Sequence, residues 1–243
     1  MAINVNKVYR IVLAILNKEQ RGYLTPDQFN RLGRQAQLDL LEKSFYDYNR
    51  ALTRRNVQGV NSDYGDIADN IQEKIDVLAK SATLALANNA TTVSAPADLY
   101  RTIQIVNSDR SVNIENVKKS EYTYLKASKL TQPTDEYPVY YFDNGVFNIL
   151  PQTITNPIVD YIKIPVDPKW GYTIGGNGQY LYDSSVYDEV TNTTGSTNFE
   201  LHPSEETNLV IKILAMAGVI IKDPSVVQMA AAEEMKEFNQ ENS

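Results

Sequence analysis

His202 is the only histidine in this chain, so any histidine-based catalysis or histidine metal ligation would have to use it. It stands directly before Pro203 and Ser204, where a helix is predicted to begin. Capping or packing at a helix start explains a histidine there without any chemistry. We therefore expect no catalytic residue, no metal site and no cofactor site built on His202.

The acidic residues form no convincing constellation either. Asp63, Asp66 and Asp69 cluster near a predicted helix start, but a calcium loop needs ligands at alternating positions and a distal glutamate, and that pattern is absent. Negative charge favoured by a helix N-terminus explains them better. The adjacent pair Asp135 and Glu136 resembles the paired acids of a glycosidase, but 30 acidic residues make chance pairs unavoidable.

The glycine-rich stretch Gly175-Gly-Asn-Gly178 resembles a phosphate-binding loop only superficially. No Lys-Ser/Thr pair follows it, and it lies between β-type segments, whereas a phosphate loop joins a strand to a helix. We interpret it as a flexible turn. The sequence as a whole therefore does not predict an enzyme.

Arg50, Arg54 and Arg55 come at the end of a long predicted helix, where cations complement the helix dipole. They could also contact phosphates or an acidic partner. Arg31 and Arg34 add to the basic character of the same helix, so we treat the three terminal arginines as candidate interface residues.

Tyrosine is unusually common, with 16 residues against six phenylalanines and a single tryptophan. Tyrosine offers apolar area with a polar tip, which suits interfaces as well as half-buried strands. The segment 169–198 has little evident core to join, so an interface is the favoured interpretation there. The candidate interface residues in it are Trp170, Tyr172, Tyr180, Leu181 and Tyr182.

Composition bounds these possibilities. The chain has 243 residues, 42% of them hydrophobic, which is enough for one large or two small domains with a real core. It has no cysteine, so disulfides and thiolate metal sites are excluded. The N-terminus lacks a signal-peptide pattern, and the longest apolar run, 213–221, is about half a membrane span. We expect a protein that is neither secreted nor inserted in a membrane.

Charge is distributed unevenly. Residues 1–60 hold ten Lys and Arg against five Asp and Glu, a net charge of +5, whereas the other residues hold 13 and 25, a net charge of −12. The total is −7. Such asymmetry predicts either two faces with different partners or two solvated surfaces of opposite sign.

The elements that would position these residues begin with helices. Residues Val5–Lys18 show a helical apolar stripe that includes Ile15 and Leu16. Thr25, Pro26 and Gln28 form a helix start with a capping box, and the stripe that follows runs from Phe29 to Leu52. A third helix is predicted over residues 66–80.

The centre of the chain has β-type patterns. Residues 82–86 and 91–94 read as a strand and a returning strand around an Asn88-Asn89 turn, and 101–106 is a further strand. Residues 115–128 are predicted to form a short helix. Residues 139–150 form a hairpin around Asn144-Gly145, because this dipeptide supplies the positive φ angles of a tight turn. Another strand covers 158–164.

Two helices are predicted near the C-terminus, one starting at His202 or Ser204 and one after Asp223-Pro224. The predicted fold class is α+β, with a helical bundle from both ends of the chain, an antiparallel β-rich centre and a long inserted arm. The expected divisions are N-terminal helices at 1–80, a β-rich region at 81–168, the arm at 169–198, and at 199–243 a helix pair that packs with the N-terminal helices.

Several segments resemble the head-to-tail connector proteins of tailed bacteriophages, namely the tail tubular protein A family and the ring or adaptor proteins of crAss-like phages. The similarity covers most of the chain, but its motifs are strand-proline and helix-cap patterns and not catalytic signatures. The long 169–198 segment departs from the shorter tail tubular proteins and is similar to the crAss-like form. The segments are the opening helices, 95–101, 147–151, 159–172, 199–206 and the closing helices around 221–224.

The resemblance implies a virion structural protein without enzymatic activity. Its expected partners are identical subunits in a ring, usually of twelve copies, the portal protein above, the next tail or ring protein below, and phage DNA that passes through without sequence-specific binding. The expected location is the portal vertex at the tail junction, after assembly in the host cytoplasm. Two rivals stay open: a receptor- or carbohydrate-binding module of a tail appendage, and a hydrolase that uses scattered acids.

Overall fold

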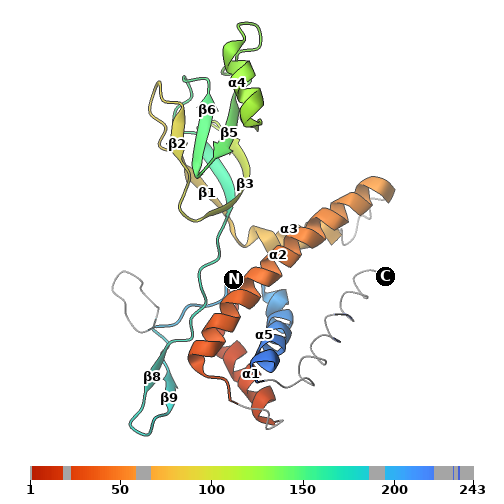
Figure 1. Ribbon diagram of the computed structural model, residues 1–243, viewed down its shortest axis with the longest axis vertical. Helices are drawn as coiled ribbons and strands as arrows, with labels where there is room; N and C mark the ends of the chain where they lie inside the picture. The colour runs from red at the N-terminus through yellow and green to blue at the C-terminus, as the bar shows by residue number, and fades with distance from the viewer. Residues whose placement is uncertain are drawn as a thin grey trace. The chain divides into compact units, whose positions relative to one another are not determined.

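The computed structural model (Figure 1) describes residues 2–18, 23–58, 67–185 and 195–221, together with Ala232 and Met235. The chain divides into two compact units, one of Met1–Val77 with Pro165–Ser243 and one of Leu78–Ile164. Helices dominate the first unit and a curled, mostly antiparallel sheet dominates the second. The predicted α+β class is confirmed. The described part of the 169–198 segment belongs to the helical unit.

The helical unit draws its elements from both ends of the chain (Figure 1). Its core joins α1, α2 and α5 to residues that flank the small hairpin β8–β9. The elements are α1 (Val5–Lys18), α2 (Pro26–Gln58), α3 (Ile67–Asp76), β8 (Tyr172–Ile174), β9 (Tyr180–Tyr182), the 3₁₀ turn η1 (Pro203–Glu205) and α5 (Glu206–Ile221).

Helix α1 has the predicted bounds, and its apolar stripe faces the core. Val5, Val8 and Val12 are fully buried, as expected for residues three and four apart on one helix face. Ile15, which was expected on the same side, is 42% exposed. Its neighbour Leu16 takes the core position, because successive residues are rotated by about 100° around the helix.

Helix α2 starts with the predicted capping box. The Thr25 N–H donates to Gln28 Oε1 at 3.1 Å, and the Gln28 N–H donates to Thr25 Oγ1 at 3.4 Å. Farther along the helix, Gly33 leaves room for the ring of Phe199, which would lie 3.1 Å from a Cβ at position 33. The glycine therefore serves close packing in the middle of a helix.

Two helix boundaries differ from the sequence-based expectation. The third helix ends at Asp76 and not at residue 80, because Ala79 and Lys80 pair with the strand Ile158–Lys163 in the sheet of the second unit. Near the C-terminus, η1 precedes α5 and begins at Pro203. His202 caps it, with Nδ1 accepting a hydrogen bond from the Ser204 N–H at 3.3 Å. The second C-terminal helix predicted from Asp223 lies outside the described residues, except for Ala232 and Met235.

The central unit is one sheet in the order β1-β7-β3-β4-β5-β6-β2, antiparallel throughout except between β4 and β5. Its core contains Tyr140, Phe147, Val159 and Tyr161. The elements are β1 (Ala79–Thr83), β2 (Thr92–Ser94), β3 (Leu99–Val106), β4 (Asn113–Asn116), α4 (Lys119–Ala127), β5 (Val139–Asp143), β6 (Val146–Leu150) and β7 (Ile158–Lys163).

The β5–β6 hairpin is as predicted, with Asn144 at φ 48° and Gly145 at φ 78° in its turn. Two other expectations for this unit were wrong. Residues 82–86 and 91–94 do not pair as a hairpin, because β1 pairs with β7 and β2 pairs with β6. The helix expected over 115–128 is shorter, because Glu115 and Asn116 join β5 in the sheet before α4 begins.

Candidate interaction site

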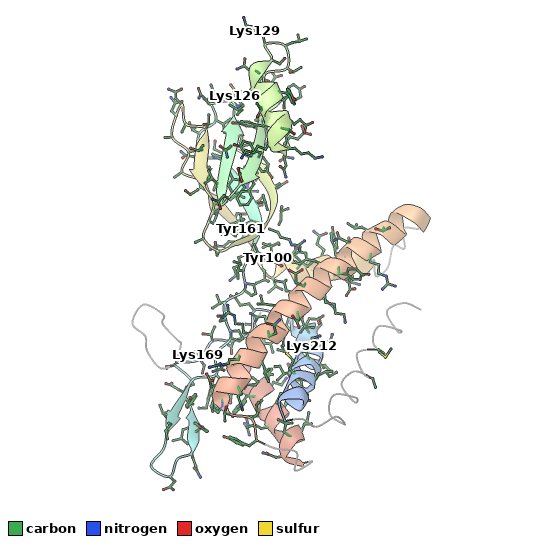
Figure 2. The ribbon with its side chains drawn as sticks, in the orientation of Figure 1. Tyr100, Lys126, Lys129, Tyr161, Lys169 and Lys212 are labelled. Carbon is green, nitrogen blue, oxygen red and sulfur yellow. The ribbon has the colours of Figure 1, made fainter. Side chains whose placement is uncertain are left out.

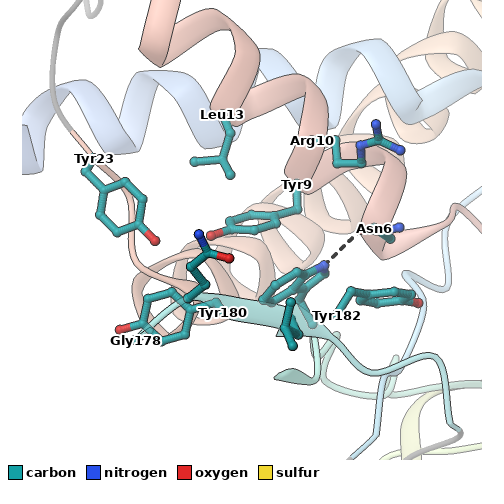
Figure 3. Close-up of a pocket in the computed structure, with 11 residues that line it drawn as sticks. Asn6, Tyr9, Arg10, Leu13, Tyr23, Gly178, Tyr180 and Tyr182 are labelled. Atoms are coloured by element: carbon teal, nitrogen blue, oxygen red, sulfur yellow. Dashed lines mark hydrogen bonds between the residues drawn. The ribbon is translucent and has the colours of Figure 1, made fainter. Parts of the chain in front are cut away.

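An aromatic pocket lies between α1 and the β8–β9 hairpin (Figure 3). It is an open cavity of about 810 Å³. Helix α1 contributes two polar and two apolar side chains, and the hairpin contributes its turn and the whole of β9. The lining residues are Asn6, Tyr9, Arg10, Leu13, Tyr23, Trp170, Gly178, Gln179, Tyr180, Leu181 and Tyr182.

Trp170 is the floor of this site and is only 4% exposed. Its indole Nε1 donates to Asn6 Oδ1 at 3.1 Å (Figure 3), and its backbone N–H donates to Asn30 Oδ1 at 2.7 Å. The Asn30 side chain in turn donates to the Trp170 carbonyl at 3.3 Å. The expectation that this segment has little core to join was therefore wrong, because α1 and α2 offer Trp170 both apolar contacts and hydrogen-bond partners.

Aromatic rings extend from Trp170 in both directions. The ring of Tyr9 lies 4.4 Å from it on the α1 side, and those of Tyr172 and Tyr182 lie 6.0 and 5.6 Å from it on the hairpin side, measured between centroids. Such pairs contribute about 0.5–1.5 kcal/mol each beyond area burial. The predicted interface tyrosines Tyr172 and Tyr182 thus serve partly as anchors of the hairpin.

Tyr9 joins the pocket to the helical core. Its hydroxyl donates to the Leu24 carbonyl at 3.3 Å. Burial raises the pKa of the Tyr9 phenol well above its usual range, and the neighbouring Tyr23 raises it further. Tyr9 therefore stays protonated at physiological pH and acts in this site as a hydrogen-bond donor, not as a base.

The hairpin exposes apolar side chains beyond this anchored base. Ile174 is 68% exposed, Leu181 52% and Tyr180 38%. The Gly175–Gly178 stretch forms the turn, with Gly178 at φ 75°, in agreement with its interpretation as a turn. Between Tyr172 and Tyr182 the sequence contains no charged residue and no proline. Exposed apolar residues on a rigid base are typical of interaction surfaces.

The base of the hairpin is closed by hydrogen bonds to the backbone of residues 171 and 183. The Asp183 N–H donates to the Gly171 carbonyl at 2.9 Å, and the Gly171 N–H donates to Ser196 Oγ at 3.0 Å. A Cβ at position 171 would lie 2.2 Å from the Gly195 carbonyl oxygen, so only glycine fits there. Residues 186–194 of the predicted arm lie outside the described residues.

Arg50, the arginine candidate whose side chain is described, does not line this pocket. Arg50 lies near the end of α2, half-buried, and its charge acts on Asp47. The side chains of Arg54 and Arg55 lie outside the described residues. Arg31 and Arg34, which were expected to add basic character, pair with Asp27 at 3.1 Å and with Asp167 at 3.0 Å, so acids offset part of this charge.

The polar clusters of the central unit hold strands together. Asp160 on β7 accepts hydrogen bonds from Ser81 on β1, from Gln104 on β3 and from Arg110 in the turn between β3 and β4. Burial raises the pKa of this carboxyl, but these hydrogen bonds outweigh burial and hold the pKa below its usual value. Asp135 and Glu136 are exposed, and Asp135 accepts a hydrogen bond from Thr153.

No catalytic arrangement emerges among the described residues. Within the described ranges, no three His, Cys, Asp or Glu side chains are grouped so that they could hold a metal ion. No helix in the described part of the chain is long and apolar enough to cross a membrane. The pocket can bind by ring stacking, by its exposed apolar rim and by the polar groups of Asn6, Arg10 and Gln179.

Sequence reasoning missed the α1 half of this site. Asn6, Tyr9, Arg10 and Leu13 recur three and four residues apart, so they share one helix face, and that spacing was an available signal. The spacing did not indicate what this helix face contacts, because Trp170 is more than 150 positions away in the sequence. No known family model matches the chain. No significantly similar curated protein is found either.

Proposed function

We propose that this chain is a virion structural protein, a head-to-tail connector of a tailed bacteriophage. It forms a closed ring below the portal, usually of twelve copies, and links the portal to the tail while DNA passes through the lumen. The proposal starts from the resemblance of segments such as 147–151 and 159–172 to phage connector proteins.

The single observation that carries the proposal beyond this resemblance is the anchored hairpin. Trp170 fixes its base to α1 and α2, while Ile174 and Leu181 present apolar side chains to solvent. An apolar surface whose base is already packed in the protein loses less conformational entropy when a partner covers it than a free loop would. A soluble domain with no partner gains nothing from such a hairpin, whereas an assembling subunit does.

Charge supports a lumen that does not hold DNA. Each phosphate contact adds salt-dependent affinity and would slow the passage of DNA. The residues after position 60 carry a net charge of −12, so they are better suited to line a conduit than the basic first 60. Those basic residues then face outward or meet an acidic neighbour.

The test is the assembly state of the purified full-length chain, alone and mixed with the portal protein encoded by the same genome. Electron micrographs and native mass are expected to give closed rings. A chain that stays monomeric in both samples under all solution conditions tested would refute the proposal.

The aromatic pocket gives specific support to one alternative, a receptor- or carbohydrate-binding module of a tail appendage. Exposed rings such as Tyr23, 56% exposed, with the amide of Gln179 beside them, suit stacking on a sugar. Such modules often form trimers. A trimeric mass together with saturable binding of an oligosaccharide from the host surface would favour this alternative over the ring.

A further inference from the structure

Neither edge of the β8–β9 hairpin pairs with another strand among the described residues. The Gly175 N–H donates to the Gln179 carbonyl, and the Asp183 N–H donates to the Gly171 carbonyl. These hydrogen bonds show which residues point their backbone groups toward each other inside the hairpin. In an antiparallel ladder the alternate residues point their backbone groups outward. In the register of these two strands, the outward-facing residues are Tyr172 and Ile174 on β8, and Tyr180 and Tyr182 on β9.

No other described segment pairs with these edges: no backbone hydrogen bond links them to the rest of the described chain. An exposed edge is normally blocked by charge, proline or a bulge. The segment Tyr172–Tyr182 has no charge and no proline, and its register is regular. A two-stranded hairpin is also marginal alone and gains from further strands. β8 and β9 are only three residues long, which itself limits edge pairing. Within the described part of the chain, however, neither their sequence nor their register blocks the addition of a strand.

We propose that β9 of one copy pairs with β8 of the next copy, so that the hairpins form a continuous antiparallel collar. The inference rests on the proposed function, since it supplies the contact that closes the ring. In this pairing Tyr180 lies opposite the neighbour's Ile174, and Tyr182 lies opposite the neighbour's Tyr172. The register repeats the one that each hairpin already has internally.

A second copy of the chain is the occupant that fits best. Both edges are uncharged, so no like charges oppose each other when they meet. Pairing of two identical β9 edges would leave both β8 edges uncovered, whereas head-to-tail pairing covers both edges of every copy once the rotation between copies closes a ring.

The aromatic pocket agrees with this choice of edges. It is lined by every residue of β9 and by none of β8, so a strand added at the β9 edge would lie next to residues of the pocket. The neighbour's Ile174, the most exposed large apolar residue of the hairpin, would come beside Tyr180 at the pocket wall. The pairing would therefore bury apolar surface on both copies in addition to making backbone hydrogen bonds.

Cysteine cross-linking tests the pairing directly, because the chain has no native cysteine. Two full-length variants, Ile174→Cys and Tyr180→Cys, are purified separately, mixed, assembled and oxidised. Paired residues on adjacent strands lie about 5.5 Å apart between Cα atoms, within disulfide range. We expect a covalent dimer in the mixture and little in either variant alone, since a lone thiol then faces a tyrosine or an isoleucine.

Assembled rings without cross-links in the mixture would overturn the collar but leave the connector function standing. Cross-linking of Tyr180→Cys alone as efficient as in the mixture would also overturn it, in favour of two β9 edges meeting. If the wild-type chain forms no rings with its portal, the proposed function itself fails.

A proline substitution provides an independent test. Ile174→Pro removes an outward N–H and leaves the internal ladder of the hairpin intact. The matched control Ile174→Thr keeps the N–H and a strand-favouring side chain. Rings should be lost in Ile174→Pro at unchanged circular dichroism and retained in Ile174→Thr. Rings in both variants, or in neither, would show that backbone pairing at this edge does not hold the assembly.

Discussion

The indole N–H of Trp170 donates to the side-chain oxygen of Asn6 at 3.1 Å, which ties the hairpin to the first helix across 164 positions of sequence. The contact makes the base of the hairpin part of the helical core, while its tip stays exposed. Stability and assembly should therefore respond to different residues of the same short segment.

Trp170→Ala should lower the free energy of unfolding by about 3–5 kcal/mol, the usual cost of removing a buried large aromatic side chain. Urea denaturation followed by circular dichroism measures this loss. The control is Leu181→Ala in the same segment, where the side chain is 52% exposed and the change should stay below about 1 kcal/mol. Equal effects of the two variants would contradict the anchoring role of Trp170.

Gly171→Ala should destabilise the helical unit, because its new Cβ would lie 2.2 Å from the Gly195 carbonyl oxygen and the backbone would have to move. We expect a cost of about 1–3 kcal/mol, the range for overpacking. Gly176→Ala in the turn is the matched control, since a Cβ there meets nothing within 4 Å. A melting temperature for Gly171→Ala as high as that of Gly176→Ala would disprove the close contact.

The ion pair of Lys74 with Glu205, at 2.5 Å, should make stability depend on acid. Burial alone would raise the pKa of Glu205, but the hydrogen bonds from Lys74 and Asn208 outweigh it and hold the pKa below its usual value. A glutamate whose pKa is lower in the folded than in the unfolded state stabilises the folded protein when the pH is above the ordinary glutamate pKa. This stabilisation is lost as the pH falls through the pKa that the group has in the folded state.

Lys74→Met should therefore cost about 3 kcal/mol at neutral pH, because Glu205 would stay buried without its partner. The cost should shrink in acid, because the buried carboxyl without its lysine becomes protonated there, while the wild type loses the contribution of the ion pair. Denaturation of wild type and variant at both pH values provides the measurement. A cost that is the same at both would mean that packing, and not charge, is lost.

Replacement of Thr173–Leu181 by a short Gly-Ser turn should leave the helical circular dichroism intact and block assembly with the portal. The replacement stops before Tyr182, because that ring packs on Trp170. Particle incorporation in infected cells gives the readout. If the variant unfolds, the tip belongs to the core; if it assembles normally, the hairpin is not the contact.

Duplex DNA should bind the isolated chain only weakly at about 150 mM salt, since exposed charges more than a Debye length apart are screened there and the chain carries a net charge of −7. Fluorescence anisotropy across a salt series measures this. Tight, steeply salt-dependent binding that is abolished by the triple substitution Arg50→Ala, Arg54→Ala and Arg55→Ala would contradict a conduit that does not hold its DNA.

Short sequence patterns predicted those parts of the structure that are determined by residues close together in the chain. The capping box of Thr25 and Gln28 marked the start of α2, and Asn144-Gly145 marked the β5–β6 turn. Long-range pairing explains the misses. Ala79 and Lys80 continue a helical pattern but join β7, and Trp170 lies in a polar, glycine-rich stretch yet finds its partners on α1 and α2.

The first and the last strand of the central unit lie side by side. Its first strand, β1, pairs with its last strand, β7, so that Ala79 lies opposite Ile162. The chain therefore enters and leaves the central unit at two neighbouring positions, about 5 Å apart as in any strand pair. A module attached in this way can be exchanged for another of different size, or replaced by a tight turn, without remodelling its host. The helical unit should accordingly keep its fold when a domain of another size is placed between Val77 and Pro165.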